Sequence, residues 1–242
     1  PYTTLFRSDI LNSSGDTITH FKSVYAGMGS FMLPVSMGEK YKAIVSTTEG
    51  IKKEFSLPEP EANRLALSIT ERNGVIHYTI LHTPQKKLSE NLYLVAHIRG
   101  FLLFIQPIEK EQGAINLQSV PEGILTLTIL DGNYLPHSER LAFVRRENNS
   151  VWKLTPDKSS YDSRSPVSLD IHLSDLSGQP IKGNFSLSVT DNYAIGCDSI
   201  GDNFLSNLLL TSDLKGYIHQ PGYYFASPSP RKQTELDILL MV

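Results

Sequence analysis

Strict alternation between apolar and polar residues is the feature that most constrains how this chain can fold. Segments 125–130 (Leu-Thr-Leu-Thr-Ile-Leu) and 185–190 (Phe-Ser-Leu-Ser-Val-Thr) alternate without a break, and segments 75–80 and 92–98 are rich in β-branched and aromatic residues. Successive side chains of a strand point to opposite faces, so this alternation buries one face and leaves the other in water. The pattern predicts a mostly β protein built from antiparallel β-sandwiches.

Turn signals separate the expected strands. Clusters of Gly with Asp, Asn, Ser or Pro occur at 14–16, 72–74, 131–133 and 177–180. Short strands with turns at this spacing favour tandem β-sandwiches over β-α-β units. No long helical pattern appears before residue 200.

A short C-terminal helical segment is expected after residue 200. Four apolar residues at positions i, i+1, i+4 and i+5 would share one helical face: Phe204, Leu205, Leu208 and Leu209. Asp202 is the expected N-cap and Gly216 the C-terminal signal. A second helix is expected to begin near Gln233.

Two breaks divide the chain. A proline-punctuated acidic stretch covers 57–61, and a polar run covers 145–150. The predicted domains are a truncated β-sandwich at 9–58, a second β-sandwich at 61–147, a third at 150–196, and a truncated helix-loop-helix extension at 197–242; the resemblance described below implies that the sandwiches at 9–58 and 150–196 are macroglobulin-like.

The two ends of the chain have unusual sequences. Residues 1–8 resemble a translated sequencing adapter, and the alternative is a genuine edge strand. At the other end, the apolar run 238–242 stops without a cap, which suggests truncation. We therefore expect the sequence to be a window on a longer chain.

Composition excludes several classes of protein. The formal net charge of −3, from 22 basic and 25 acidic residues, argues against a general nucleic-acid binder. The apolar runs, such as 101–105 and 208–210, are too short to span a bilayer. A single cysteine, Cys197, cannot form an internal disulfide or a thiolate metal site.

Several motifs together resemble a known family. In order along the chain they are 27–31 with 38–41, 138–144, 183–191, 207–218, 221–225 and 236–241. They resemble large exported proteins of Bacteroidetes that carry macroglobulin-like (MG2-type) β-sandwich domains followed by domains like the plug of TonB-dependent receptors. Val242 stands where that family usually has Leu.

The resemblance implies a location in the periplasm or at the outer membrane. It implies a non-catalytic spacer or partner-binding array in a TonB-linked uptake or surface protein, with a protein partner or a downstream plug-like domain. No nucleic-acid partner is expected, and membrane association would come only through other parts of a longer chain.

Two other functions remain open. The first is a protease-binding module of the α2-macroglobulin type without a thioester, since Cys197 lies between Gly196 and Asp198 rather than in Cys-Gly-Glu-Gln. The second is a set of accessory domains of a surface enzyme.

No catalytic, cofactor or metal site is predicted. Gly27 and Gly29 match only the first two glycines of a dinucleotide loop, so a tight turn or bulge is favoured. The seven histidines show no zinc-ligand spacing. An acidic loop around Asp191, Asp198 and Asp202 could offer oxygen ligands to calcium, but turn and capping roles explain it better.

One aromatic-rich loop is the candidate interaction site. It contains Tyr217, Tyr223, Tyr224 and Phe225. Exposed, these side chains would offer a partner a large contact area with few rotatable bonds. The alternative, which we favour, is that the loop packs back onto the sandwich.

Overall fold

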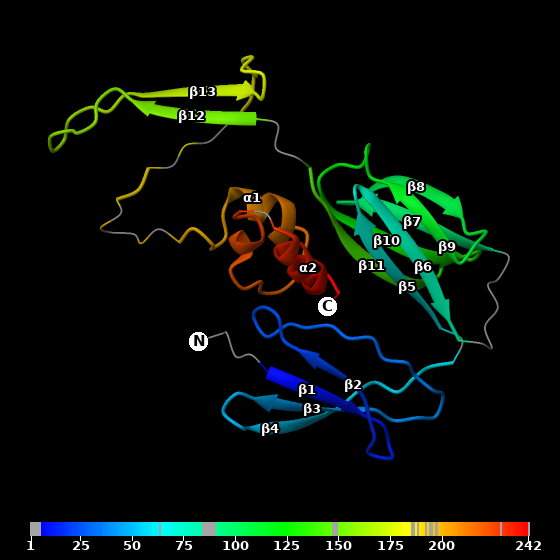
Figure 1. Cartoon of the computed structure of the whole chain (residues 1–242). Coiled ribbons are helices and arrows are strands. Elements are labelled where there is room, and N and C mark those ends of the chain that lie inside the picture. The colour runs from blue at the N-terminus through cyan, green and yellow to red at the C-terminus, as the bar shows by residue number, and fades with distance from the viewer. Residues whose placement is uncertain are drawn as a thin grey trace. The chain divides into compact units, whose positions relative to one another are not determined.

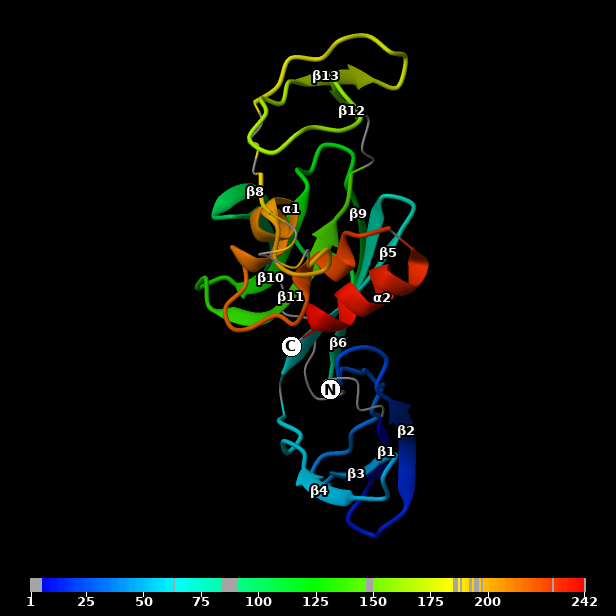
Figure 2. The same cartoon turned by 90° about the vertical axis from the view of Figure 1, so that its left-hand side faces the viewer.

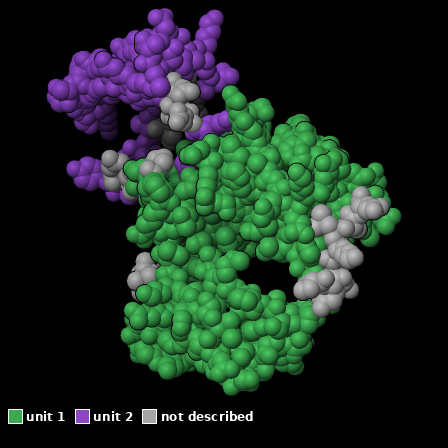
Figure 3. Space-filling view, turned by 45° about the vertical axis from the view of Figure 1, so that its right-hand side comes forward, with its two compact units in different colours: residues 1–144, 199–242 green, residues 145–198 purple. Residues whose placement is uncertain are grey.

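The computed structural model describes residues 6–62, 64–83, 91–146, 150–184, 187, 189–191, 193, 196, 198–227 and 229–241. The chain is mostly β, with several antiparallel sheets and a short C-terminal helical segment, which confirms the predicted fold class. It divides into two compact units, residues 1–144 with 199–242 and residues 145–198 (Figure 3). The predicted segments 9–58, 61–147 and 197–242 belong almost wholly to the first unit, and 150–196 belongs to the second.

The first sheet has four antiparallel strands in the order β2-β1-β3-β4 (Figure 1). Their bounds are β1 Phe6–Leu11, β2 Thr17–Lys22, β3 Lys42–Thr47 and β4 Lys52–Ser56. Phe6, Arg7 and Ser8, which belong to the adapter-like stretch 1–8, lie in β1, one of the two inner strands, and pair with β3. Between residues 9 and 58 the described residues therefore form one sheet.

The sandwich consists of two sheets that enclose the main core (Figure 1). One has the order β11-β10-β7-β8, with β7 Leu92–Ile98, β8 Phe101–Pro107, β10 Gly123–Asp131 and β11 Pro136–Val144. The other has the order β5-β6-β9, with β5 Leu65–Arg72, β6 Val75–His82 and β9 Gln112–Asn116. Leu94, Leu127 and Ile129 are fully buried between the sheets, as the alternation at 92–98 and 125–130 predicts.

The second unit contains a β-hairpin, β12 Ser150–Pro156 with β13 Leu169–Asp175. After a turn the chain returns along β13, where the Ile181 amide donates a hydrogen bond to the Leu173 carbonyl at 3.0 Å. This hairpin supplies the only strands in the described part of the predicted third sandwich. Three residues of the predicted strand 185–190 lie outside the described residues: Phe185, Ser186 and Ser188.

The C-terminal segment is helical, as expected. It contains α1 Phe204–Ser206, the π-helical turn η1 Asn207–Thr211, the 3₁₀ turn η2 Pro221–Tyr224 and α2 Pro230–Leu239. None of the described helices is both long enough and apolar enough to cross a membrane.

Two local predictions for this segment need correction. The N-cap of α1 is Asn203 rather than Asp202, and it forms a capping box with Ser206. Asp202 instead accepts a hydrogen bond from the Ser206 hydroxyl at 2.6 Å. The predicted apolar face is also displaced, because Leu209 and Leu210 are buried while Phe204 and the other two predicted members are exposed.

A π-helical turn runs through this stretch. The Ser212 amide donates to the Asn207 carbonyl at 3.0 Å, an i to i+5 bond. Such a turn holds more residues than the 3.6 of an α-helix, so residues that an α-helical spacing would align are rotated apart.

Candidate functional site

The C-terminal segment builds a second core on the outer face of the sandwich (Figure 2). Its buried apolar members come from β10, β11, the turns η1 and η2, and α2 with its C-cap: Ile124, Phe143, Leu209, Leu210, Tyr224, Leu236 and Leu240. Because Ile124 faces this core while Leu125 faces the main core, β10 is covered on both sides.

Two arginines of the sandwich anchor the segment. The Arg99 Nε atom lies 3.0 Å from Asp213 Oδ2, and its guanidinium also donates to the Leu208 carbonyl. Arg140 Nη1 donates to the Leu240 carbonyl at 2.9 Å, beside the end of α2. Burial raises the pKa of the Asp237 carboxyl above its ordinary value, while the charge of Arg140 opposes this rise.

A tight turn of the first unit also contacts the segment. We call residues 24–29 the Tyr25 finger, in which Met28 donates to the Tyr25 carbonyl at 2.8 Å. Gly27 has a φ of +80°, a left-handed conformation that favours glycine. At Gly29 a Cβ atom would lie 2.7 Å from the Lys22 carbonyl oxygen. The structure thus places these glycines in a turn with a close backbone approach.

The finger inserts its tyrosine into the aromatic loop. The rings of Tyr25 and Tyr223 stack with centroids 4.0 Å apart and planes 7° apart, and Tyr224 meets Tyr25 edge-on at 5.8 Å. The Tyr25 hydroxyl donates to Gln220 Oε1 at 3.2 Å. Residues almost two hundred positions apart therefore share one contact.

The predicted interaction residues lie in two different environments. Tyr224 is only 1% exposed, and Phe225 packs edge-on against Phe143 at 5.6 Å. Tyr223 is half-buried under the finger, whereas Tyr217 is 85% exposed. Three of the four residues pack within the chain, and Tyr217 alone among the four points its ring to solvent.

A buried carboxylate holds the aromatic loop to α2. Glu235 is 1% exposed, and its two oxygens accept from the Tyr223 hydroxyl at 2.7 Å and from Arg231 Nε at 2.8 Å. Lys232 Nζ lies 4.6 Å from the centroid of the Tyr223 ring. Burial and the contact with Glu235 raise the pKa of Tyr223 to about 12. The tyrosine is thus a hydrogen-bond donor at neutral pH rather than a base.

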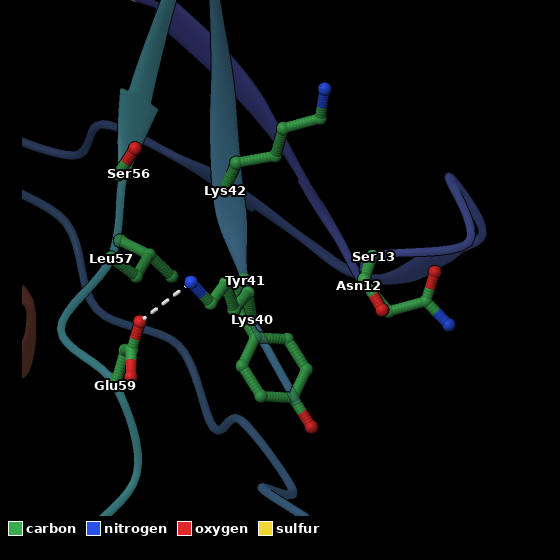
Figure 4. Close-up of a pocket in the computed structure, with 8 residues that line it drawn as sticks. All are labelled: Asn12, Ser13, Lys40, Tyr41, Lys42, Ser56, Leu57 and Glu59. Atoms are coloured by element: carbon green, nitrogen blue, oxygen red, sulfur yellow. Dashed lines mark ion pairs between the residues drawn. The ribbon is translucent and has the colours of Figure 1, made fainter. Parts of the chain in front are cut away.

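A polar pocket of about 310 Å³ lies at one end of the first sheet (Figure 4). It is lined by Asn12, Ser13, Lys40, Tyr41, Lys42, Ser56, Leu57 and Glu59. Lys40 pairs with Glu59 at 3.0 Å, and Lys42 pairs with Glu54 at 3.2 Å. Because each lysine already has a carboxylate partner, the pocket offers little net attraction to an anion.

His82 makes ordinary polar contacts. His82 Nε2 lies 2.8 Å from Glu111, and hydrogen bonds to the Thr83 carbonyl and to Glu111 raise its pKa. Within the described residues, no three His, Cys, Asp or Glu side chains are grouped as metal ligands. Cys197, which entered the sequence interpretation, lies outside the described residues.

Comparison with known proteins leaves the family open. No protein-family model matches the chain, and no curated protein matches it. The resemblance to macroglobulin-like proteins therefore stays a prediction. The structure adds Tyr25, Glu235 and Arg140 to the candidate site, and no local sequence signal singles them out.

Proposed function

We propose that this chain is a non-catalytic β-sandwich scaffold that serves as a spacer and partner-binding module of an exported, outer-membrane-associated protein. The observation that carries the proposal is the second core, which joins the sandwich, the C-terminal segment and the Tyr25 finger. A spacer must hold its parts in a fixed orientation, and contacts between distant segments serve that purpose.

The C-terminal segment contacts both the sandwich and the first sheet of the first unit. Arg99 and Arg140 hold the C-terminal segment to the sandwich, while the stack of Tyr25 on Tyr223 holds it to the first sheet. Aromatic pairs and charge-assisted hydrogen bonds add directional constraints to apolar burial. The helical segment thus fixes the first sheet and the sandwich relative to each other.

The polar groups of the site support a structural role. Both oxygens of Glu235 are engaged by Tyr223 and Arg231, and Asp202 accepts from the Ser206 and Thr211 hydroxyls. A catalytic carboxylate needs an oxygen that can reach substrate. The resemblance to macroglobulin-like proteins of Bacteroidetes supports the extracytoplasmic location and a downstream plug-like domain or protein as partner.

Electron-spin distance measurements test whether the C-terminal segment fixes the first sheet and the sandwich relative to each other. Spin labels at Glu49→Cys and Asn133→Cys, in a Cys197→Ser background, would report on the first sheet and the sandwich. We expect one narrow distance distribution, broadening in Tyr25→Ala and unchanged in the exposed control Tyr217→Ala. A broad distribution in the unmutated chain would contradict the proposal.

Incubation with a protease separates the proposal from the protease-binding alternative. We expect any protease to cleave the chain and dissociate. A protease that stays bound after a single cleavage would favour the alternative instead.

A further inference from the structure

The polar pocket of the first sheet lies where three of its strands begin or end (Figure 4). Strand β1 ends at Leu11, β3 begins at Lys42 and β4 ends at Ser56. The volume of about 310 Å³ falls at the lower end of the range for small-molecule sites. The pocket can therefore hold a small ligand but not a folded partner.

Contacts within the chain fix the walls of this pocket. The Leu57 amide donates to the Tyr41 carbonyl at 2.9 Å, which joins the end of β4 to the start of β3. Tyr41 is only 6% exposed, and its hydroxyl accepts from the Ser36 amide at 3.0 Å. A site that is held in place before its ligand arrives loses less entropy on binding.

One ion pair of the lining keeps unused hydrogen-bonding groups. Lys40 Nζ lies 3.0 Å from Glu59 Oε1, and the two side chains are 74% and 70% exposed. An ammonium has three donors and a carboxylate has about four acceptor positions, so a single contact leaves most of them available. The Ser56 hydroxyl also lines the pocket, and within the described chain it makes no hydrogen bond.

We propose that the pocket binds a neutral sugar through two neighbouring ring hydroxyls that meet Lys40 and Glu59 together. Such hydroxyls lie about one hydrogen-bond length apart, which matches the 3.0 Å between Lys40 Nζ and Glu59 Oε1. One hydroxyl accepts from the ammonium and the other donates to the carboxylate, and hydrogen bonds to ionised groups are about twice as strong as neutral ones. Ser56 bonds a third hydroxyl, and Leu57 supplies an apolar wall for the carbon face of the ring.

Other classes of ligand fit this lining less well. An anion gains little, because Lys40 is paired with Glu59 and Lys42 with Glu54. A zwitterion would have to separate one of these pairs to form its own. An apolar ligand would displace water from the polar lining without replacing its hydrogen bonds. A sugar replaces those hydrogen bonds and leaves both ion pairs intact.

Titration of the whole isotope-labelled chain with sugars, followed by its backbone amide NMR shifts, tests the proposal. The probes are methyl α-glucoside, methyl α-mannoside and methyl α-galactoside. We expect at least one of them to give saturable shifts at Tyr41, Lys42, Ser56 and Leu57, with a dissociation constant in the millimolar range. Lys40→Met keeps the aliphatic stem and should weaken binding about tenfold or more, because a hydrogen bond to a charged group is lost.

A matched control breaks an ion pair outside the pocket. Arg64 lies 2.6 Å from Glu61, and both side chains are exposed, as in the pair of Lys40 with Glu59. Arg64→Met removes the same charge, and we expect it to bind the sugar like the unmutated chain. Exposed ion pairs contribute little to stability, so both variants should fold.

Several results would overturn the inference. These are the absence of saturable shifts with all three glycosides, unchanged binding in Lys40→Met, and equal weakening in Arg64→Met. Equal affinity for tetrahydropyran-2-methanol, which has the ring but no neighbouring hydroxyls, would also overturn it, as would tighter binding of glycine or inorganic phosphate. If Lys40→Met fails to fold, Glu59→Gln takes its place and must weaken binding. The spin-label test of the scaffold does not involve this pocket, so either proposal can fail alone.

Discussion

Strand β10 and residues 152–155 of strand β12 both alternate apolar with polar side chains, but their surroundings are very different. In β10, Leu125, Leu127 and Ile129 are fully buried in the main core, and Ile124 is buried on the opposite face. In β12, Leu154 is 52% exposed. The difference lies in the layers above each strand. The second sheet and the C-terminal segment cover β10, while β12 belongs to a two-stranded hairpin.

Alternation therefore specifies a strand and its two faces, but not what covers them. A two-stranded hairpin without a packed layer is marginally stable in water. We infer that the first unit carries most of the free energy of unfolding and that the second unit unfolds separately. The predictions below test this difference from the largest effect to the smallest.

Removing a buried side chain from the centre of the second core should lower the free energy of unfolding the most. Tyr224→Ala removes a buried ring and is expected to lower the free energy of unfolding by about 3–5 kcal/mol. Tyr217→Ala, in the same loop but exposed, should change it by at most about 0.5 kcal/mol. Urea unfolding followed by circular dichroism measures both, and equal losses would contradict the packing of the loop.

Replacing one leucine with alanine in each strand should then show the difference in burial between β10 and β12 directly. Leu127→Ala in β10 is expected to cost about 2–5 kcal/mol. Leu154→Ala in β12 should cost less than about 1 kcal/mol, because the side chain is half exposed. A loss for Leu154→Ala as large as that for Leu127→Ala would mean that β12 is covered by a packed layer.

High pH should have a smaller effect, localised to the aromatic loop. The pKa of Tyr223 is about 12 in the folded chain and 10.0 without its surroundings. The folded state therefore favours the protonated ring. The resulting stability is complete below pH 10 and is lost as pH rises toward 12.

Phenolate absorbance tests this titration. Tyr223→Phe should remove one late-titrating tyrosine from the absorbance curve of the unmutated chain. The prediction is wrong if the variant and the unmutated chain show the same absorbance change at high pH.

Local chemistry made the sandwich predictable from sequence. Strand β7 coincides with the predicted segment 92–98, because alternation and β-propensity act within a few residues. The π-helical turn was not predictable, since a 3.6-residue period cannot anticipate the i to i+5 bond to Ser212. The stack of Tyr25 on Tyr223 depends on the tertiary fold, so no local pattern reports it.

Hydrogen exchange under increasing denaturant tests the central claim, that the C-terminal segment shares one core with the sandwich and that the hairpin of the second unit unfolds separately. We expect the amides of Leu127 and Leu240 to open together, at the highest denaturant concentration. The amide of Leu154 should open well below it. Opening of Leu240 before Leu127, or of Leu154 together with both, would contradict the account.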